Sequence, residues 1–304
     1  MIRIVKQILL NRNTILVFAV LAGIIAGDKA SLLKGFTFPA LAITMTFSMT
    51  GMRMNQMLNI SGIYKPMLMG ILLNYVLFSL VLLPLAWWLM PTPELFYGFV
   101  VIAAAPPGVA IIPFSYILKG DVVYAIISVV GAFIGSIFIA PLLVNIFVAS
   151  GGIDSLELFL MMVQLVVLPL LISRFLLWKP LFRYVEPIRG KVVDWGFAIL
   201  IFVAVGLNRE VFFTNHYLLL KVSAVLLFTT FVVGFVYSKI AIKVGVLPEK
   251  VVTQSMLVAI KSSGFSVFTA LSLFGKEAAI PSAVMAVVVL LYLIYLSLKS
   301  RNKE

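Results

Sequence analysis

The 304-residue chain is 63% hydrophobic and 11% charged, with a mean hydropathy of +1.18, and a water-soluble domain of this size cannot hide so much apolar surface in one core. The formal net charge is +12, but in so apolar a chain a basic excess indicates membrane topology rather than nucleic-acid binding. The chain has no cysteine and one histidine, His216, which excludes disulfides, thiolate metal sites and histidine metal clusters.

Long apolar runs without the two-residue alternation of β-strands predict an all-α polytopic membrane protein. We treat the whole chain, residues 1–304, as a single membrane domain. The first span is expected to stay as a helix, since no small-residue cleavage site follows it. The ten predicted transmembrane helices cover residues 13–27, 36–52, 66–90, 97–118, 122–149, 156–178, 191–208, 216–241, 250–274 and 278–298.

The lysines and arginines are unevenly distributed between the predicted loops. With the N-terminus inside, 17 of the 23 basic residues lie on the cytoplasmic side, five lie on the opposite side, and Lys261 lies within a span. Because cytoplasmic loops are enriched in Lys and Arg, this distribution predicts a multi-pass protein of the cell membrane with both termini in the cytoplasm.

The chain also resembles itself at an offset of 155 residues. Gly51 ends one span and Gly206 ends another, each followed closely by asparagine and arginine. Pro106 and Gly108 interrupt the fourth span, and Gly264 follows two serines that interrupt the ninth. An odd number of helices in each half makes the repeats inverted, and such carriers bind their substrate at the midplane between the halves. We expect two inverted five-helix repeats, at about residues 13–149 and 156–298.

Three segments resemble motifs of the bile acid:sodium symporter (BASS) family. They are residues 45–54 (MTFSMTGMRM), 103–121 (AAAPPGVAIIPFSYILKGD) and 260–275 (IKSSGFSVFTALSLFG). The resemblance extends over nearly the whole chain and implies a ten-helix carrier. It implies a panel domain of helices 1, 2, 6 and 7 and a core domain of helices 3–5 and 8–10, with broken helices 4 and 9 crossing.

The departures from that family concern its cation site. The resemblance implies sodium ligands on helices four, five and nine, because a hard cation is bound by oxygen atoms that include a carboxylate. Among the side-chain oxygens that the family's cation site would require, the one that we can place in this chain is the amide oxygen of Asn74, on helix three. We therefore expect a divergent member that binds no sodium at the family's sites. The equivalent positions here hold Ile111, Ile112, Ala125, Val129, Leu257 and Lys261.

Lys261 is the one charged side chain well inside a predicted span, about ten residues from either end, or roughly 15 Å of helix rise. A lysine at bilayer depth costs about 2.5–3.5 kcal/mol on insertion scales, so it should face protein or water and serve a function. Snorkelling is the alternative. Leu257 lies one turn away, so the ammonium is expected to occupy the space of the absent sodium, either as a permanent charge or by exchanging a proton in each cycle.

The predicted function is secondary transport of a small organic anion by alternating access. Transport is expected not to depend on sodium, and a proton is the alternative coupling ion. The positive N-terminal ends of the half-helices that start near Gly108 and Gly264 are expected to attract a carboxylate. No metal or other cofactor is expected. The predicted substrate-binding residues are Lys261, Asn74, Pro107, Gly108, Val109, Ser262, Ser263 and Gly264.

Two alternatives stay open. One is a sodium-independent facilitated exporter of the auxin-efflux-like type, and the other is a channel or a structural membrane protein in which Lys261 only bonds backbone carbonyls. Arsenite export is disfavoured, because the arsenite carriers that this chain resembles use a cysteine on helix four, and this chain has no cysteine. No acid, base and nucleophile constellation indicates an enzyme. The expected partners are the organic anion and the lipid bilayer, with a monomer expected and the oligomeric state left open.

Overall fold

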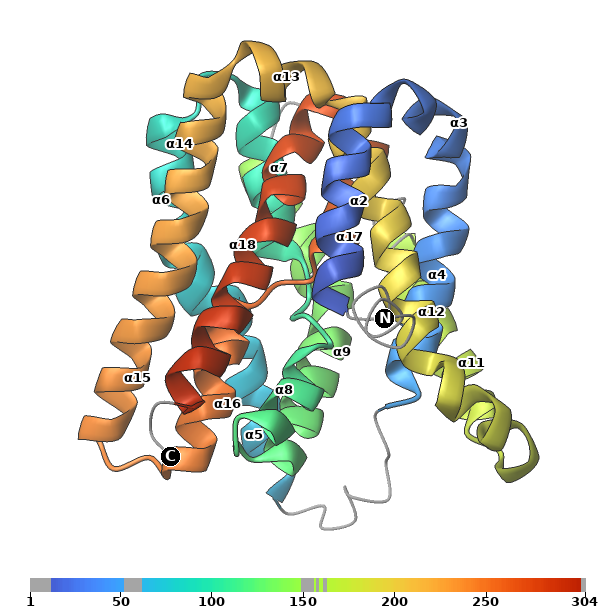
Figure 1. Cartoon of the computed structure of the whole chain (residues 1–304). Coiled ribbons are helices and arrows are strands. Elements are labelled where there is room, and N and C mark those ends of the chain that lie inside the picture. Colours follow the sequence, from blue (N-terminus) through green and yellow to red (C-terminus); the bar gives the residue numbers. More distant parts are fainter. Residues whose placement is uncertain (1–11, 52–61, 149–155, 157–158, 161–162, 302–304) are drawn as a thin grey trace.

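The computed structural model describes residues 12–51, 62–148, 156, 159–160 and 163–301. The regular structure of these residues is helical and includes no β-strand, which confirms the all-α class. Six helical stretches are long and apolar enough to cross a membrane, judged by length and composition. One of them, Thr14–Met49, contains two predicted spans, because 3₁₀ turns keep the chain helical where it reverses direction (Figure 1). The ten-span count and the inverted repeats stay predictions.

The first half of the chain ends in a long helix that begins at a side-chain cap. The Asp121 side chain accepts a 2.8 Å hydrogen bond from the Tyr124 backbone N–H, and such a cap fixes where a helix starts. The elements, with two 3₁₀ turns and one π-helical turn, are α2 (Arg12–Ala26), η1 (Gly27–Lys29), α3 (Ala30–Leu33), η2 (Lys34–Phe36), α4 (Thr37–Met49), α5 (Tyr64–Ile71), η5 (Leu72–Leu77), α6 (Phe78–Leu89), α7 (Pro93–Ala104), α8 (Ile111–Ile117) and α9 (Val122–Phe147).

The second half contains two further π-helical turns and a sharp turn at Gly275. Gly275 has φ +85°, a left-handed conformation that favours glycine, and it follows the end of α17. The elements are η6 (Val163–Val167), α11 (Leu168–Leu176), α12 (Lys179–Leu207), α13 (Arg209–Thr214), α14 (His216–Leu227), η7 (Phe228–Val233), α15 (Gly234–Lys243), α16 (Pro248–Ala259), α17 (Ser263–Leu273) and α18 (Lys276–Arg301).

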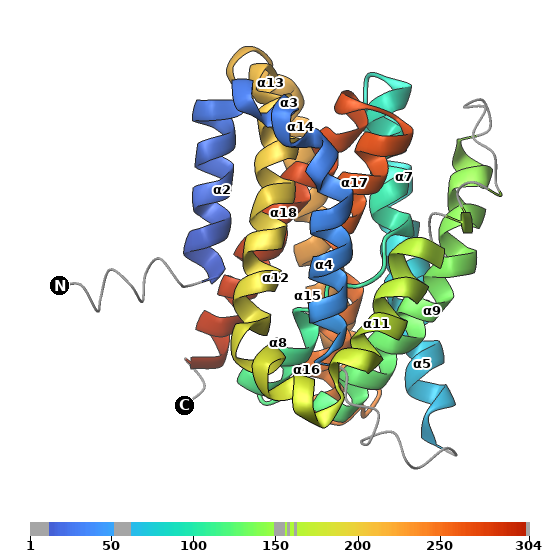
Figure 2. The same ribbon diagram turned by 90° about the vertical axis from the view of Figure 1, so that its right-hand side faces the viewer.

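Helix α12 packs between α2 and α4, and α11 packs on α4 (Figure 2). The upper end of α12 packs closely on the turn that follows α2, since a Cβ added at Gly206 would lie 2.6 Å from the Cβ of Ala30 and 3.0 Å from the Cα of Gly27. On the other side of the molecule, α7 packs against α9 and α18, and α17 packs against α18. The two interrupted helices therefore lie between the α2–α4–α12 layer and the rest of the bundle.

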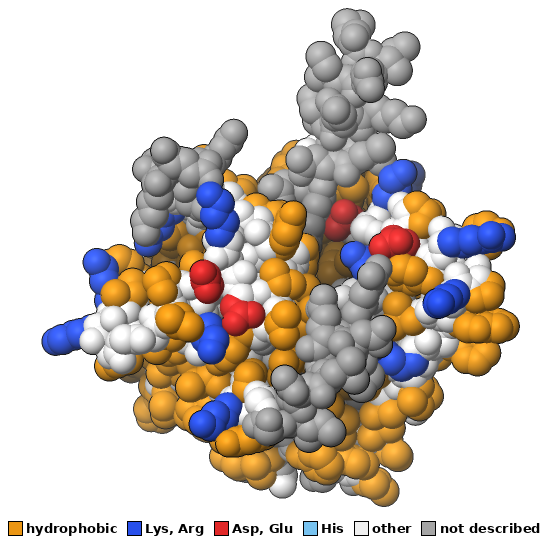
Figure 3. All heavy atoms as spheres, turned by 90° about the horizontal axis from the view of Figure 1, so that it is seen from below, with side chains coloured by type: hydrophobic (Ala, Val, Ile, Leu, Met, Phe, Trp, Pro, Cys, Tyr) orange, Lys and Arg blue, Asp and Glu red, His pale blue; other side chains and the backbone are white. Residues whose placement is uncertain are grey.

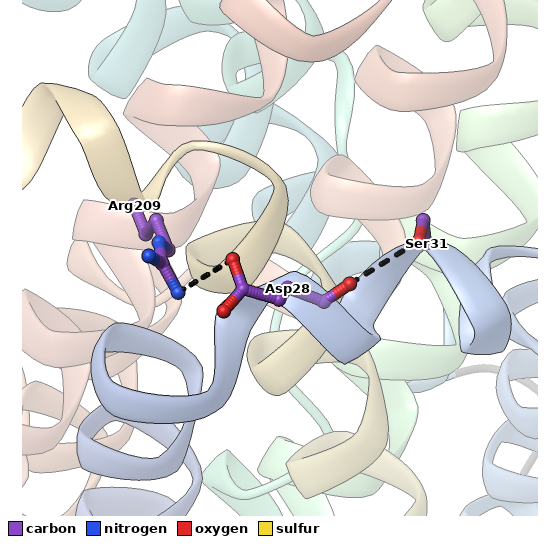
Figure 4. Close-up of polar contacts among 3 residues, drawn as sticks. All are labelled: Asp28, Ser31 and Arg209. Carbon is purple, nitrogen blue, oxygen red and sulfur yellow. Dashed lines mark hydrogen bonds and ion pairs between the residues drawn. The ribbon is translucent and has the colours of Figure 1, made fainter.

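An ion pair joins the same two helix ends (Figure 4). The guanidinium of Arg209, at the start of α13, lies 2.7 Å from the carboxylate of Asp28, which follows α2. The Ser31 hydroxyl donates a 3.4 Å hydrogen bond to the Asp28 carbonyl. The Arg209 and Asp28 side chains are 33% and 77% exposed, so solvent weakens their attraction, and such pairs contribute about 0.2–1 kcal/mol.

Basic residues of the described part of the chain gather at one end of the bundle. The start of α5, the end of α8 and the turn from α15 to α16 lie at the lower end in Figure 1, and Lys65, Lys119, Lys243 and Lys250 are at or beside these helix ends. Figure 3 shows Lys and Arg side chains distributed around this face. The expected cytoplasmic position of the two termini concerns residues outside the described part of the chain.

Candidate functional site

The predicted interruptions of the fourth and ninth spans lie where two helix pairs meet. Helix α7 ends at Ala104 and α8 begins at Ile111, whereas α16 ends at Ala259 and α17 begins at Ser263. The two short extended segments pair as an antiparallel bridge at Pro107 and Lys261. Because buried backbone groups must find partners inside the protein, this pairing satisfies groups that the broken helices leave free.

Two hydrogen bonds hold the bridge together. The Gly108 N–H donates to the Ile260 carbonyl at 3.1 Å, and the Ser262 N–H donates to the Pro106 carbonyl at 2.9 Å. A Cβ added at Gly108 would lie 2.9 Å from Cγ2 of Ile260, closer than carbon atoms pack. The absence of a side chain at Gly108 therefore permits this crossing.

Lys261 is only 2% exposed, and its side chain does not snorkel toward the membrane surface. Its Nζ donates hydrogen bonds to the carbonyl oxygens of Ala103 at 2.8 Å and Ala105 at 3.0 Å. The same atom lies 4.8 Å from the ring centre of Tyr75 and 5.2 Å from that of Phe78. Carbonyl oxygens and aromatic faces both attract a cation, so the pocket suits an ammonium group.

Local chemistry explains why a carbonyl is free at this point. In an uninterrupted helix the Ala103 carbonyl would accept from the N–H four residues later, but that residue is Pro107, which has none. The C-terminal end of a helix also carries partial negative charge. Lys261 therefore replaces the missing donor and places its Nζ at the negative end of α7.

Asn74 bonds one of the two carbonyl groups that Lys261 bonds. Its Nδ2 donates to the Ala105 oxygen at 3.1 Å, so Asn74 and Lys261 share one acceptor. Asn74 is fully buried in the π-helical turn Leu72–Leu77, and such turns frequently occur at functional sites. Its Oδ1 has no hydrogen-bond partner within the described residues.

The other predicted cation-site positions belong to the hydrophobic core. Their side chains contain no oxygen atom and pack against neighbouring apolar residues, so they present no ligand to a hard cation. Every one of them is at most 9% exposed. These residues are Ile111, Ile112, Ala125, Val129 and Leu257.

The predicted anion-binding residues divide between the two breaks. Ser262, Ser263 and Gly264 lie at the start of α17, and the buried Ser262 Oγ has no hydrogen-bond partner within the described residues. Pro107, Gly108 and Val109 lie in the extended segment before α8. The half-helix predicted to start near Gly108 begins, as α8, at Ile111, after a turn in which the Ile111 N–H donates to the Gly108 carbonyl at 3.1 Å.

Two cavities adjoin the crossing. The larger one, of about 670 Å³, lies between α4, α8 and α12 and is lined by residues that include Ser48, Arg189 and Asp194. The smaller one, of about 30 Å³, lies beside the bridge and is lined by residues that include Lys261 and Ser262. The larger volume falls within the range of small-molecule sites, about 300–1,000 Å³.

The sequence reasoning missed a buried polar cluster around α16. Thr253 Oγ1 lies 3.2 Å from Ser115 Oγ, Gln254 Nε2 donates to the Tyr124 hydroxyl at 2.8 Å, and the Tyr237 hydroxyl donates to Gln254 Oε1 at 2.8 Å. The cluster ties α16 to α8, α9 and α15. Polar residues next to the predicted helix-nine motif were the available signal, but hydroxyl and amide groups within spans usually bond neighbouring helices.

Comparisons with known proteins agree with this architecture. The chain is 25% identical over 257 residues to a chloroplastic protein of Arabidopsis thaliana named as a probable sodium/metabolite cotransporter, BASS1. The aligned region covers 83% of this chain but only 62% of that relative. Residues 38–215, from α4 through the first interrupted helix to the residue before α14, match the model of the Sodium Bile acid symporter family. The second interruption and Lys261 lie beyond that match, but it covers more than half of the chain, which therefore belongs to the Sodium Bile acid symporter family.

Proposed function

We propose that this protein is a secondary transporter of a small organic anion in which the tethered ammonium of Lys261 takes the place of a bound sodium ion. The observation that supports this most directly is the position of Lys261 Nζ, 2.8 Å and 3.0 Å from two backbone carbonyls at the crossing. Oxygen atoms at the crossing are what a sodium ion would require, and a lysine already bonds them. We further propose a location in the cell membrane with both termini in the cytoplasm.

We infer that Lys261 carries a permanent charge, because its contacts favour the ammonium form and offset the cost of burying it. Its contacts are two carbonyl oxygens, which accept hydrogen bonds, and the faces of Tyr75 and Phe78, which attract cations. A neutral amine would gain less from each of these contacts, and they offer no donor to its lone pair. We therefore infer that neither sodium nor a proton on Lys261 drives transport.

The anion is proposed to bind near the start of α17. The first backbone N–H groups of a helix have no partner within that helix, and its dipole favours negative charge there. Ser262 adds a buried hydroxyl with no partner among the described residues. Helix α17 has 11 residues, whereas α8 has only seven, so we assign the carboxylate to the α17 end.

Without a driving ion the proposed transport is facilitated, so a sodium-independent facilitated exporter is the form of this proposal that Lys261 favours. A cation that is covalently attached cannot be released on the far side of the membrane, so it cannot transmit the energy of an ion gradient. Under this scheme the substrate gradient and the membrane potential set the direction of flux.

The test begins with a thermal-shift screen of carboxylates on the purified protein, because a ligand that binds only the folded state raises its stability. Hits are then followed in proteoliposomes with sodium inside and outside, or with sodium replaced throughout by N-methylglucamine. We expect equal, saturable flux in both media, stimulated by substrate on the opposite side. Saturable stimulation by millimolar sodium would contradict the proposal, and non-saturable flux would indicate a channel.

A further inference from the structure

One aromatic ring lies between the two cavities beside the crossing. The large and the small cavity share three lining residues, Val109, Ala110 and Phe197. Val109 and Ala110 belong to the interrupted segment before α8, whereas Phe197 comes from α12 on the opposite wall. The shared lining makes the two spaces neighbours, with the Phe197 side chain at their boundary.

The ring is packed directly against the first turn of α17. Phe197 is 9% exposed, and a Cβ added at Gly264 would lie 2.6 Å from both Cδ1 and Cε1 of the ring. No real Cβ approaches a ring so closely, so the space that a side chain at Gly264 would fill is occupied by Phe197. The ring therefore covers the start of α17 from the side of the large cavity.

The small cavity is too small for a carboxylate-bearing molecule. Its volume of about 30 Å³ is comparable to the space that one water molecule occupies. Ser262 lines this cavity, is 3% exposed, and has a hydroxyl without a hydrogen-bond partner within the described residues. A polar atom thus lies in a narrow space, and a solute larger than water reaches it only when a wall moves.

We propose that Phe197 is the gate between the large cavity and the start of α17. Because α12 packs between α2 and α4, the ring moves with that layer, and a displacement of α12 relative to α17 uncovers Ser262 and Gly264. This inference relies on the proposed function only to identify the solute that passes the gate as an organic anion. The gate itself is a property of the two cavities and the ring.

A single-cysteine reporter tests the gate without any substrate. The chain has no cysteine, so Ser262→Cys introduces the only thiol. The purified full chain is treated with an anionic sulfonatoethyl methanethiosulfonate, and the modified fraction is followed by mass spectrometry. With Phe197 present we expect slow modification, and in the Phe197→Ala background we expect the rate to rise at least tenfold. Phe197→Tyr keeps the ring and should keep the slow rate.

The matched control is Val193→Ala, one turn earlier on α12. Val193 lines the large cavity but is not among the residues that line the small one, so its truncation should leave the rate unchanged. Each variant is checked for a single size-exclusion peak and an unchanged melting temperature. If Phe197→Ala fails these checks, Phe197→Leu, which keeps apolar volume but removes the ring, replaces it and should still raise the rate severalfold.

Two results would overturn the gate. One is rapid modification of Ser262→Cys with Phe197 in place, and the other is the same acceleration by Val193→Ala as by Phe197→Ala. Neither result depends on which solute is transported, so the gate and the anion-transport proposal can fail separately.

Discussion

The two helix interruptions meet at one place but arise in different ways. The break between α7 and α8 contains Pro106 and Pro107, which lack backbone N–H groups and disfavour helix in the preceding residue. The break between α16 and α17 contains no proline. It forms where Ile260 accepts a hydrogen bond from Gly108 and Ser262 donates one to Pro106 across the crossing. Local sequence determines the first break, and tertiary contact determines the second.

The two breaks also supply different chemistry. The first provides carbonyl oxygens, at Ala103 and Ala105, while the second provides the ammonium of Lys261 and the hydroxyl of Ser262. Substitutions in the second break should therefore change ligand binding most. Substitutions in the first break should mainly change stability.

The largest expected effect is on binding in Lys261→Met, which keeps the length and apolar stem but deletes the cation. Lys261 bonds backbone carbonyls, so its cation is expected to act by offsetting the charge of the anion, and substrate affinity should fall by more than about 1.5 kcal/mol, the lower end for a lost charged interaction. Titration of a carboxylate identified by thermal shift measures this loss. Lys261→Arg keeps a permanent charge, so it should retain binding better than the methionine variant. Wild-type affinity in Lys261→Met would mean that the lysine is purely structural.

The charge state of Lys261 is tested in the same series. If the ammonium is permanent, wild type and Lys261→Arg should show parallel pH profiles of flux, because arginine does not deprotonate in proteins. A wild-type profile that varies with pH where the arginine variant does not would instead support proton exchange.

The next largest effect should be on stability in Gly108→Ala. The new Cβ would lie 2.9 Å from Cγ2 of Ile260, and overpacking of this kind costs about 1–3 kcal/mol. Thermal unfolding in detergent, followed by intrinsic fluorescence, measures the change. Gly190→Ala is the control, since no atom lies within 4 Å of the Cβ built there. Equal melting temperatures for the two variants would contradict the close crossing.

A smaller loss is expected for Asn74→Leu. The substitution removes the donor to the Ala105 carbonyl, but that oxygen still accepts from Lys261, so no buried carbonyl loses its last partner. The cost should be near that of one ordinary hydrogen bond, about 0.5–1.5 kcal/mol. In a double-mutant cycle with Lys261→Met the two losses should not add, because both side chains bond one atom.

Sequence reasoning reached both breaks, the burial of Lys261 and the place of Asn74, although only the first break has a strong local signal. Prolines mark the break, and a lysine among apolar residues is conspicuous. Backbone carbonyls at the crossing were predicted as partners of Lys261, but the sequence could not say which ones, since the carbonyls of Ala103 and Ala105 look the same as any other backbone group until the helices cross. Phe197 was missed for a similar reason: among 24 phenylalanines, its contact with Gly264 exists only in three dimensions.

The smallest effect should come from the ion pair at the opposite end of the α2–α12 layer. Asp28→Asn removes the charge that faces Arg209, but the Asp28 side chain is 77% exposed, so the loss should lie within about 0.2–1 kcal/mol. Because salt screens exposed charges, the difference from wild type should shrink further in 1 M salt, where the Debye length is about 3 Å. The backbone packing at Gly206 is the comparison, since a Cβ there would lie 2.6 Å from that of Ala30. Gly206→Ala should therefore lower the melting temperature more than Asp28→Asn at every salt concentration. The reverse order would mean that the ion pair, rather than close helix packing, joins the two helix ends.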